Sequence, residues 1–319
     1  MEKIEKSRFD WTGPDRQAGE QMARKSVTYW QDAMRRLGKN KPAVVCACII
    51  TIVLLASVLI PLFSHFTINE QHYSHLDAPM MTECTDPAHE GYTHLFGTDS
   101  LGRDIFVRVW SGGQVSLFIA VVAVFANLVI GVVYGGISGY VGGAVDNIMM
   151  RVVEIINGIP YLMIVILLKM VVGRSDTTGI ISLIVAYGVV GWTGTARLVR
   201  GQLVALKEQE FVIAAKALGA SPARLIGRHL LPNSLSIIII ETTLAIPSAI
   251  FTEAFLSFIG MGVSIPYCSW GSLASDGIRV FQMYPSQMII PAICISVIML
   301  SFNLVGDGLR DALDPRLRR

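Results

Sequence analysis

The stretch EFVIAAKALGASPARLIGRHLLPN, residues 210–233, is a basic segment that stands between two long apolar runs. Its first half carries apolar side chains at the i, i+3, i+4 and i+7 spacing of one helix face: Phe211, Ala214, Ala215 and Leu218. Gly219 then provides a helix stop, and Ser221 before Pro222 is an N-cap followed by proline at the first helical position. We predict two short helices joined by a sharp turn, the second of which ends at Pro232.

The second of these helices has a basic side. Arg224 and Arg228 lie about one turn apart, which suits the water interface or acidic groups of another protein. An amphipathic helix lying on lipid is an alternative for such a loop. The Gly-x-Ser-Pro turn fixes a single shape, which a lipid-lying helix does not need, so we interpret the segment as a rigid helix-turn-helix.

The overall composition excludes an ordinary water-soluble domain. Of 319 residues, 52% are hydrophobic and only 16% are charged, and the mean hydropathy is +0.54. A helix of about 20 apolar residues crosses a bilayer. Candidate runs are present at 43–63, 114–145, 152–172, 178–196, 235–259 and 288–305. We predict an all-α integral membrane protein with about six transmembrane helices.

The basic residues divide unequally between the two sides of this topology. With a cytosolic N-terminus, all 26 lysines and arginines lie on the cytosolic side except Arg103, Arg108, Lys169, Arg174 and Arg279. The positive-inside rule therefore places both termini and residues 210–233 in the cytosol. The polar segment before the first span is too long for the n-region of a signal peptide, so this span is expected to remain as an anchor.

Two acidic residues fall inside the fifth predicted span and are candidates for the transport pathway. Glu253, toward its outer end, could contact a substrate amine. It could instead accept hydrogen bonds from a neighbouring helix. Glu241, nearer the inner end, is a second candidate.

Cysteines and histidines mark the outward loops. Cys84 and Cys268 lie in two different loops and could form a disulfide, or remain two free thiols. Five of the six histidines lie in the first loop: His65, His72, His75, His89 and His94. Imidazole is a common ligand of nickel and zinc, but these spacings follow no compact ligand pattern. We expect a solvated loop and no metal site.

Glycines recur every four residues in the second predicted span, at Gly131, Gly135, Gly139 and Gly143. On a helix they form a flat face that lets another helix backbone approach closely. The alternatives are that glycine is simply common in membrane spans, and that the stretch GGISGYVGG has already left the helix.

The opening segment resembles the EAA loop of permease subunits of bacterial ATP-binding cassette (ABC) importers. Ala214, Ala215 and Gly219 match the Ala-Ala and Gly of that motif, and residues 231–232 match its Leu-Pro. Two positions depart from it. Ile213 replaces the Glu of the motif, which puts any polar contact from that position in doubt, and His229 replaces a usual Ile.

Further stretches resemble the second permease of the dipeptide, oligopeptide and nickel importers. They are HLFGTDSLGRDIFVRVWSGGQVSL (94–117), GYVGGAVDNIMMRVVEIINGIP (139–160) and EAFLSFIGMGVSIPYCSWG (253–271). The resemblance implies a type I importer permease fold. It divides the chain into a cytosolic tail (1–41), a first transmembrane helix with an extracytoplasmic loop (42–110), and an ABC transporter transmembrane domain (111–319) with a coupling loop at 207–233.

The resemblance also implies the partners. Gly-x-x-x-x-Gly-Lys-Ser/Thr, the phosphate-binding loop, is absent from the sequence, so this chain is expected to bind no cofactor and to catalyse nothing. Two partner ATPases would use ATP and Mg²⁺, beside a second homologous permease, an extracytoplasmic solute-binding protein and the lipid bilayer, with no nucleic acid. The expected ATPase-coupling residues are Phe211, Ala214, Ala215, Leu218, Gly219, Ser221, Pro222 and Arg224.

The expected function is therefore that of a multi-pass permease in the bacterial cell membrane that forms half of a pathway for peptides. Nickel or another small solute is an alternative cargo. An ion-coupled secondary transporter that uses Glu241 and Glu253 is a second alternative. It is disfavoured because no inverted repeat is visible in the sequence.

Overall fold

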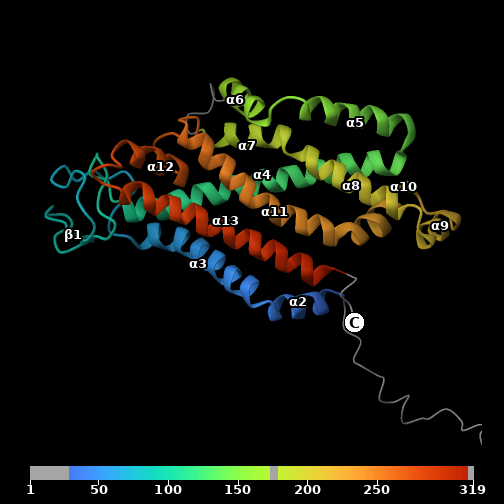
Figure 1. Ribbon diagram of the computed structural model, residues 1–319, viewed down its shortest axis with the longest axis horizontal. Coiled ribbons are helices and arrows are strands. Elements are labelled where there is room, and N and C mark those ends of the chain that lie inside the picture. The colour runs from blue at the N-terminus through green and yellow to red at the C-terminus, as the bar shows by residue number, and fades with distance from the viewer. Residues whose placement is uncertain (1–28, 173–178, 315–319) are drawn as a thin grey trace, which may run out of the picture.

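The computed structural model describes residues 29–172 and 179–314, and these residues are mostly helical (Figure 1). Most of the predicted cytosolic tail, residues 1–28, therefore lies outside the described residues, as do residues 173–178. The described part begins with α2 (Tyr29–Lys39) and α3 (Lys41–Phe63). Asn40 caps α3, because its side-chain oxygen accepts a hydrogen bond from the backbone N–H of Ala43 at 3.3 Å.

A loop region, residues 64–104, joins α3 to α4 and contains two short antiparallel strands, β1 (Thr82–Glu83) and β2 (Thr93–His94). The first half of the remaining chain forms α4 (Ile105–Val141), α5 (Gly143–Asn157), α6 (Tyr161–Val172), α7 (Ile180–Val190) and α8 (Trp192–Leu206). The second half forms α9 (Glu210–Ala217), α10 (Pro222–Arg224), the π-helix η2 (Leu225–Leu230), α11 (Leu231–Phe258), α12 (Trp270–Arg279) and α13 (Ser286–Leu313).

The spans agree in number with the hydropathy of the sequence. Within the described residues, five helices are long and apolar enough to cross a membrane, and α5 with α6 makes a sixth if that bent pair is one span. The candidate span at 152–172 is not one straight helix, because it contains the end of α5 and all of α6, which meet at 85°. Pro160 lies at the break, where it lacks a backbone N–H and disfavours helical geometry at Ile159.

Helix α4 begins earlier than the apolar run predicts. It starts at Ile105, where the side chain of Asp104 caps it by accepting a hydrogen bond from Val107 N at 2.9 Å. Arg108 therefore falls inside the helix. Its guanidinium is buried and lies 3.0 Å from the carboxylate of Asp99 in the preceding loop, which compensates the charge.

The glycines of α4 pack against α8. A Cβ atom at Gly131 would lie 2.6 Å from Thr195, and one at Gly139 would lie 2.8 Å from the carbonyl oxygen of Arg200. A Cβ at Gly135 would clash with the carbonyl oxygen of Ala196. Close packing through these three glycines is therefore confirmed. The fourth, Gly143, follows the end of α4 at a φ of +60° with open space around it, so it does not belong to this face.

The other end of α4 holds the largest fully buried side chain, Trp270 of α12. Its indole N–H donates to the carbonyl oxygen of Val109 at 2.8 Å. A Cβ at Gly113 would lie 2.6 Å from the indole and 2.8 Å from Ser57 of α3. The stretch SGGQ at residues 111–114 thus serves to bring α3, α4 and α12 together.

Pro232 does not end the second helix of the opening segment, which corrects that prediction. Residues 222–258 form a continuous helical span in which η2 leads directly into α11. Proline at this position cannot donate an α-helical hydrogen bond to residue 228. The π-helical turn changes the bonding pattern just before it, so the chain continues without a break.

We predict that Gly135→Ala destabilises the protein, because its Cβ would meet the backbone of α8. Overpacking of this kind costs about 1–3 kcal/mol. Gly136→Ala is a matched control, because the nearest atom to its Cβ, on Leu203, is 3.9 Å away. Alanine is favoured over glycine in a helix by about 1 kcal/mol, so this control should unfold at the wild-type temperature or above. Thermal unfolding of the detergent-solubilised proteins measures both, and equal melting of the two variants would contradict the packing.

Candidate functional site

The segment from α9 to η2 lies at one end of the bundle, where it packs against α8 and α11 (Figure 1). Its three buried apolar residues, Val212, Leu225 and Leu230, pack in one cluster with residues of α8 and α11: Val199, Leu203 and Ile238. This packing buries one side of the segment and leaves the other outside. The segment is therefore held in a fixed position relative to both helices.

The turn between α9 and α10 has the hydrogen bonds of a Schellman motif. Gly219 has a φ of +81°, its N–H bonds Lys216 O at 3.0 Å, and the N–H of Ala220 bonds Ala215 O at 3.1 Å. Ser221 then caps the next helix, since its hydroxyl oxygen accepts a hydrogen bond from Arg224 N at 3.4 Å. The sharp turn predicted from the sequence is present.

An exposed apolar surface covers the outer side of α9. We call it the α9 surface, and it consists of Phe211, Ile213, Ala214 and Leu218. Leu218 is 89% exposed. Together these four side chains form an apolar patch that makes little contact with the rest of its own subunit.

The remaining predicted coupling residues divide into two groups. Ser221, Pro222 and Arg224 are exposed beside the α9 surface. Ala215 was predicted to share its face, but it is half-buried and packs against the inner apolar cluster. Ile213, which replaces the Glu of the motif, is exposed instead and extends the surface with a larger apolar side chain.

Glu253 lies inside the subunit. It is 3% exposed, and its carboxylate accepts hydrogen bonds from Ser116 of α4 at 2.8 Å and from Ser257 of its own helix at 2.7 Å. Ser116 also accepts the backbone N–H of Trp270 at 3.2 Å. Glu253 therefore ties α11 to α4 and α12, which is the alternative to a pathway role that the sequence left open.

Glu241 lies beside two cavities. One, of about 220 Å³, is lined by residues of α4, α6, α7, α8 and α11 that include Asn127, Tyr161, Tyr187 and Glu241. The second, of about 550 Å³, lies toward the α9 end and is lined by Glu241 with Tyr29, Ser236 and Arg310 among others. Of the two acids of α11, Glu241 is thus the one that reaches open space.

The predicted disulfide is absent, because Cys84 and Cys268 are free thiols. Cys84 packs with Phe66 and Val107 in the loop region. Cys268 belongs to the main core, where its thiol donates to the carbonyl oxygen of Arg108 at 3.4 Å. Burial raises the pKa of Cys268, so the thiol keeps the proton that it donates.

An ion pair between Asp146 of α5 and Arg200 of α8 was not predicted from the sequence. Arg200 donates to both oxygens of Asp146, at 2.5 and 2.6 Å, and Ser138 donates to the same carboxylate at 2.5 Å. Asp146 follows the glycine turn after α4, and Arg200 lies on the α8 face that meets those glycines. Sequence separation hid the pair, because no local pattern relates two charges 54 residues apart.

The loop region between α3 and α4 is largely exposed, but its histidines are not all solvated as predicted. His72 and His94 are buried, and ligand atoms of His72, Cys84 and His94 lie within 4.8 Å of one another. The sequence showed the five histidines but not this convergence.

These features are typical of the membrane-spanning subunit of a transporter: apolar spans, polar contacts buried between them, cavities beside a half-buried acid and an exposed apolar surface at one end. Two family models match the chain. The binding-protein-dependent transport system inner membrane component matches residues 128–319, and the N-terminal TM domain of oligopeptide transport permease C matches residues 28–79. The chain belongs to this family of ABC importer permeases.

Proteins of similar sequence match this chain over its full length. The oligopeptide transport system permease protein OppC of Bacillus subtilis (strain 168) is 43% identical over 319 residues, 100% of each chain. The dipeptide transport system permease protein DppC of the same strain is 44% identical over 297 residues, covering 93% of this chain and 88% of the relative. A chain of the inward-facing MetNI methionine ABC transporter, 19% identical, superposes with a TM-score of 0.52 over 65% of this chain and 96% of its own. The fold is that of a type I importer permease.

We predict that Glu253→Ala lowers the thermal stability of the subunit, whereas Glu241→Ala does not. Removal of the Glu253 carboxylate leaves two buried serine hydroxyls without their acceptor, at a cost of about 1–3 kcal/mol. Glu241 is partly exposed beside the cavities, so its truncation exposes no such group. Melting temperatures in detergent compare the two variants. An unchanged melting temperature for Glu253→Ala would contradict its role between the helices.

Proposed function

We propose that this chain is one of two permease subunits of an ATP-driven peptide importer, and that the α9 surface binds a separate ATPase. The observation that carries the proposal is this surface, an exposed apolar face on a segment whose other side is buried against α8 and α11. The peptide cargo is supported by the relatives named for oligopeptide and dipeptide transport. Nickel or another small solute remains the alternative cargo.

The complex requires partners that supply what this chain does not. A second homologous permease would complete the pathway, two ATPases would hydrolyse ATP with Mg²⁺, and an extracytoplasmic solute-binding protein would deliver the cargo. This chain itself performs no covalent chemistry in the proposal. An ion-coupled transporter is disfavoured because it needs no docking surface such as the one on α9.

Coupling would proceed through rigid elements. Each permease subunit would place its segment from α9 to η2 in a groove of one ATPase. When the two ATPases close on ATP, each groove would move the segment that it holds. Val212, Leu225 and Leu230 would pass this displacement to α8 and α11 through their shared apolar cluster. Since η2 and α11 are continuous, the displacement reaches Glu241 and its cavities. Such rigid-body rocking exchanges inward-open and outward-open states.

Glu241 is the pathway residue in this proposal. Its carboxylate stands at the junction of the two cavities, where a peptide amino group would find a charge partner. Acidic side chains within membrane spans are costly and occur mostly where they face an aqueous route or a partner.

The membrane orientation is also a proposal, with the α9 end in the cytosol. The excess of lysines and arginines on this side supports it. So does the packing of the chain ends: the hydroxyl of Tyr29 on α2 bonds Ser236 at 2.7 Å and Leu313 O at 2.9 Å. Both ends of the described chain therefore meet near the start of α11, on the side of the α9 segment (Figure 1).

The orientation predicts opposite labelling of two single cysteines. Asp276→Cys, at the exposed side chain of α12, should react with an impermeant maleimide on intact cells, and Ser7→Cys should react only after permeabilisation. The native cysteines of the two loops are buried, so the wild type serves as the background control. Labelling of Ser7→Cys on intact cells would reverse the topology.

The coupling proposal predicts that Gly219→Ala weakens ATPase binding, while Gly227→Ala does not. A Cβ meets nothing within 4 Å at either position, and only Gly219 has a positive φ. A left-handed conformation costs alanine about 1–2 kcal/mol, which corresponds to roughly 5- to 30-fold weaker binding. The dissociation constant of the purified ATPase for the reconstituted permease pair measures the effect.

Leu218→Asp tests the apolar character of the α9 surface, whereas Gly219→Ala tests the geometry of the turn that follows it. Because this side chain is 89% exposed, the subunit should melt as the wild type does, while ATPase copurification and ATP-driven uptake are lost. Charge against an apolar groove is unfavourable. Wild-type association of both Leu218→Asp and Gly219→Ala would show that the segment is only a surface helix.

A further inference from the structure

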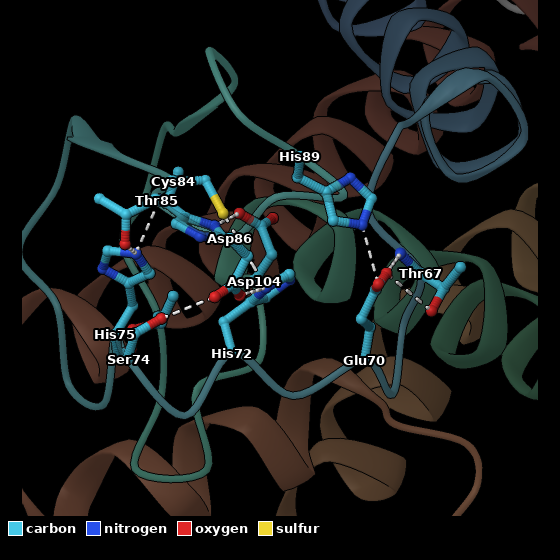
Figure 2. Close-up of polar contacts among 12 residues, drawn as sticks. Thr67, Glu70, His72, Ser74, His75, Cys84, Thr85, Asp86, His89 and Asp104 are labelled. Atoms are coloured by element: carbon cyan, nitrogen blue, oxygen red, sulfur yellow. Dashed lines mark hydrogen bonds and ion pairs between the residues drawn. The ribbon is translucent and has the colours of Figure 1, made fainter.

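The loop region between α3 and α4 gathers side chains that bind transition metals (Figure 2). The ligand atoms of His72, Cys84 and His94 lie within 4.8 Å of one another, and all three residues are buried. The ligand atoms of Glu70 and His89 form a second such group with His72. The two groups share His72, so four other potential ligands lie near its imidazole.

The two buried imidazoles are oriented by carboxylates. His72 Nδ1 lies 2.5 Å from Asp86, and His94 Nδ1 lies 2.8 Å from Asp104. A neutral histidine that donates its Nδ1 proton to a carboxylate presents an unprotonated Nε2. Histidines that ligate metals are commonly held in this way, with the other ring nitrogen on a carboxylate.

The second nitrogen of each ring has no partner among the residues that the structure describes. The side chains of His72 and His94 are 3% and 0% exposed, and Nε2 of each makes no hydrogen bond to any residue of 29–172 or 179–314. A buried polar atom without a partner is destabilising, by about 1–3 kcal/mol. Two such atoms, on histidines that share a potential ligand group with a buried thiol, point to a missing metal ion.

The walls of the cluster are apolar. Phe66 stacks on His94 with ring centroids 4.5 Å apart, and it also contacts the rings of His72 and His89. Cys84 packs in the same cluster, with its sulfur 3.9 Å from His72 Nδ1. Such a shell excludes water, which would otherwise satisfy the two nitrogens.

We propose that this cluster binds one Zn²⁺ ion, with His72, Cys84 and His94 as ligands and either His89 or Glu70 in the fourth position. Sulfur and imidazole nitrogen form the usual donor set of tetrahedral zinc, whereas calcium and magnesium take oxygen. Ligand atoms around zinc lie about 3.5 Å apart, so small side-chain rotations suffice. His89 and Glu70 now bond each other at 2.8 Å, and either can turn to the metal.

The ion would fix a region that has little regular structure of its own. Between α3 and α4 the described chain holds only the two-residue strands β1 and β2, and the three ligands span residues 72–94. The loop region in turn packs over the helix ends: Gln287 of α13 donates to Asp77 at 2.9 Å and to Thr98 O at 3.1 Å. Zinc here would be structural, joining the loop region over the end of the bundle that lies away from α9 (Figure 1).

The first test is the zinc content of the full-length wild-type protein, purified without a histidine tag, saturated with ZnCl₂ and dialysed. One zinc per chain is expected by elemental mass spectrometry. Well under one equivalent would overturn the proposal. This measurement needs no variant and no ATPase, so it is independent of the transport function proposed above.

The second test compares variants by competition with a chromophoric zinc chelator. His94→Ala and Cys84→Ser should bind zinc at least 10-fold more weakly, since even second-shell changes cost 10- to 100-fold. His65→Ala is the matched control, because His65 is an exposed histidine of the same loop region that stacks on Tyr92. Equal affinity of all three variants would show that zinc binds elsewhere.

Cobalt substitution separates a lost ligand from a misfolded loop. Co²⁺ in the wild type should show a thiolate charge-transfer band with the intense visible bands of tetrahedral coordination. In Cys84→Ser the charge-transfer band should vanish while thermal unfolding of the metal-free protein stays at the wild-type temperature. Added zinc should raise the melting temperature of the wild type but not that of Cys84→Ser. A wild-type spectrum without the thiolate band would exclude Cys84 as a ligand.

Discussion

The close approach of α4 and α8 is the contact on which the rest of the arrangement depends. Gly131, Gly135 and Gly139 bring the two backbones together, so that any Cβ on this face would meet the opposite helix. In a bilayer, where apolar surface alone does not drive helices together, such contact has to come from shape. Asp146 and Arg200 then lock α5 to α8 beside the same face. The position of helix α8 is thereby fixed, and α9 packs against it through a shared apolar cluster.

Some polar groups buried in the bundle are satisfied by a side chain from another part of the chain. Glu253 takes hydrogen bonds from two serines, and Arg108 meets Asp99. Glu253 joins two helices that are distant in the chain, whereas Asp99 lies in the loop just before the helix that carries Arg108. The Nε2 atoms of His72 and His94 have no partner among the described residues, and the same holds for other buried polar atoms such as Arg108 Nε and Trp110 Nε1. The two histidines differ from these in lying within a group of metal-ligating side chains, and this difference is the reason for the proposed zinc site.

Prolines show how the same residue serves two purposes in one fold. Pro160 separates α5 from α6 at 85°, whereas Pro232, just after the π-helical turn, leaves the path from η2 into α11 continuous. Pro247 and Pro291 also lie within long helices. Neighbouring helices satisfy the carbonyl groups that proline frees within a membrane bundle. Residues 222–258 therefore connect the turn after α9 to Glu241 in one continuous helical span, whereas the chain changes direction sharply at Pro160.

The sequence by itself determined the features that depend on local chemistry or on period. Hydropathy gave the number of spans, the four-residue glycine repeat predicted the α4 face, and Gly219 with Ser221 and Pro222 predicted the turn. Only the tertiary structure decided which side chains meet: Ala215 turns inward, Glu253 is satisfied while Glu241 reaches a cavity, and Cys84 lies beside His72 and not beside Cys268. The physical reason is that periodicity and turn preferences act over a few residues, whereas the path of an irregular loop is set by what it packs against. His72, Cys84 and His94 converge through such a path, and their spacing in the chain carries no sign of it.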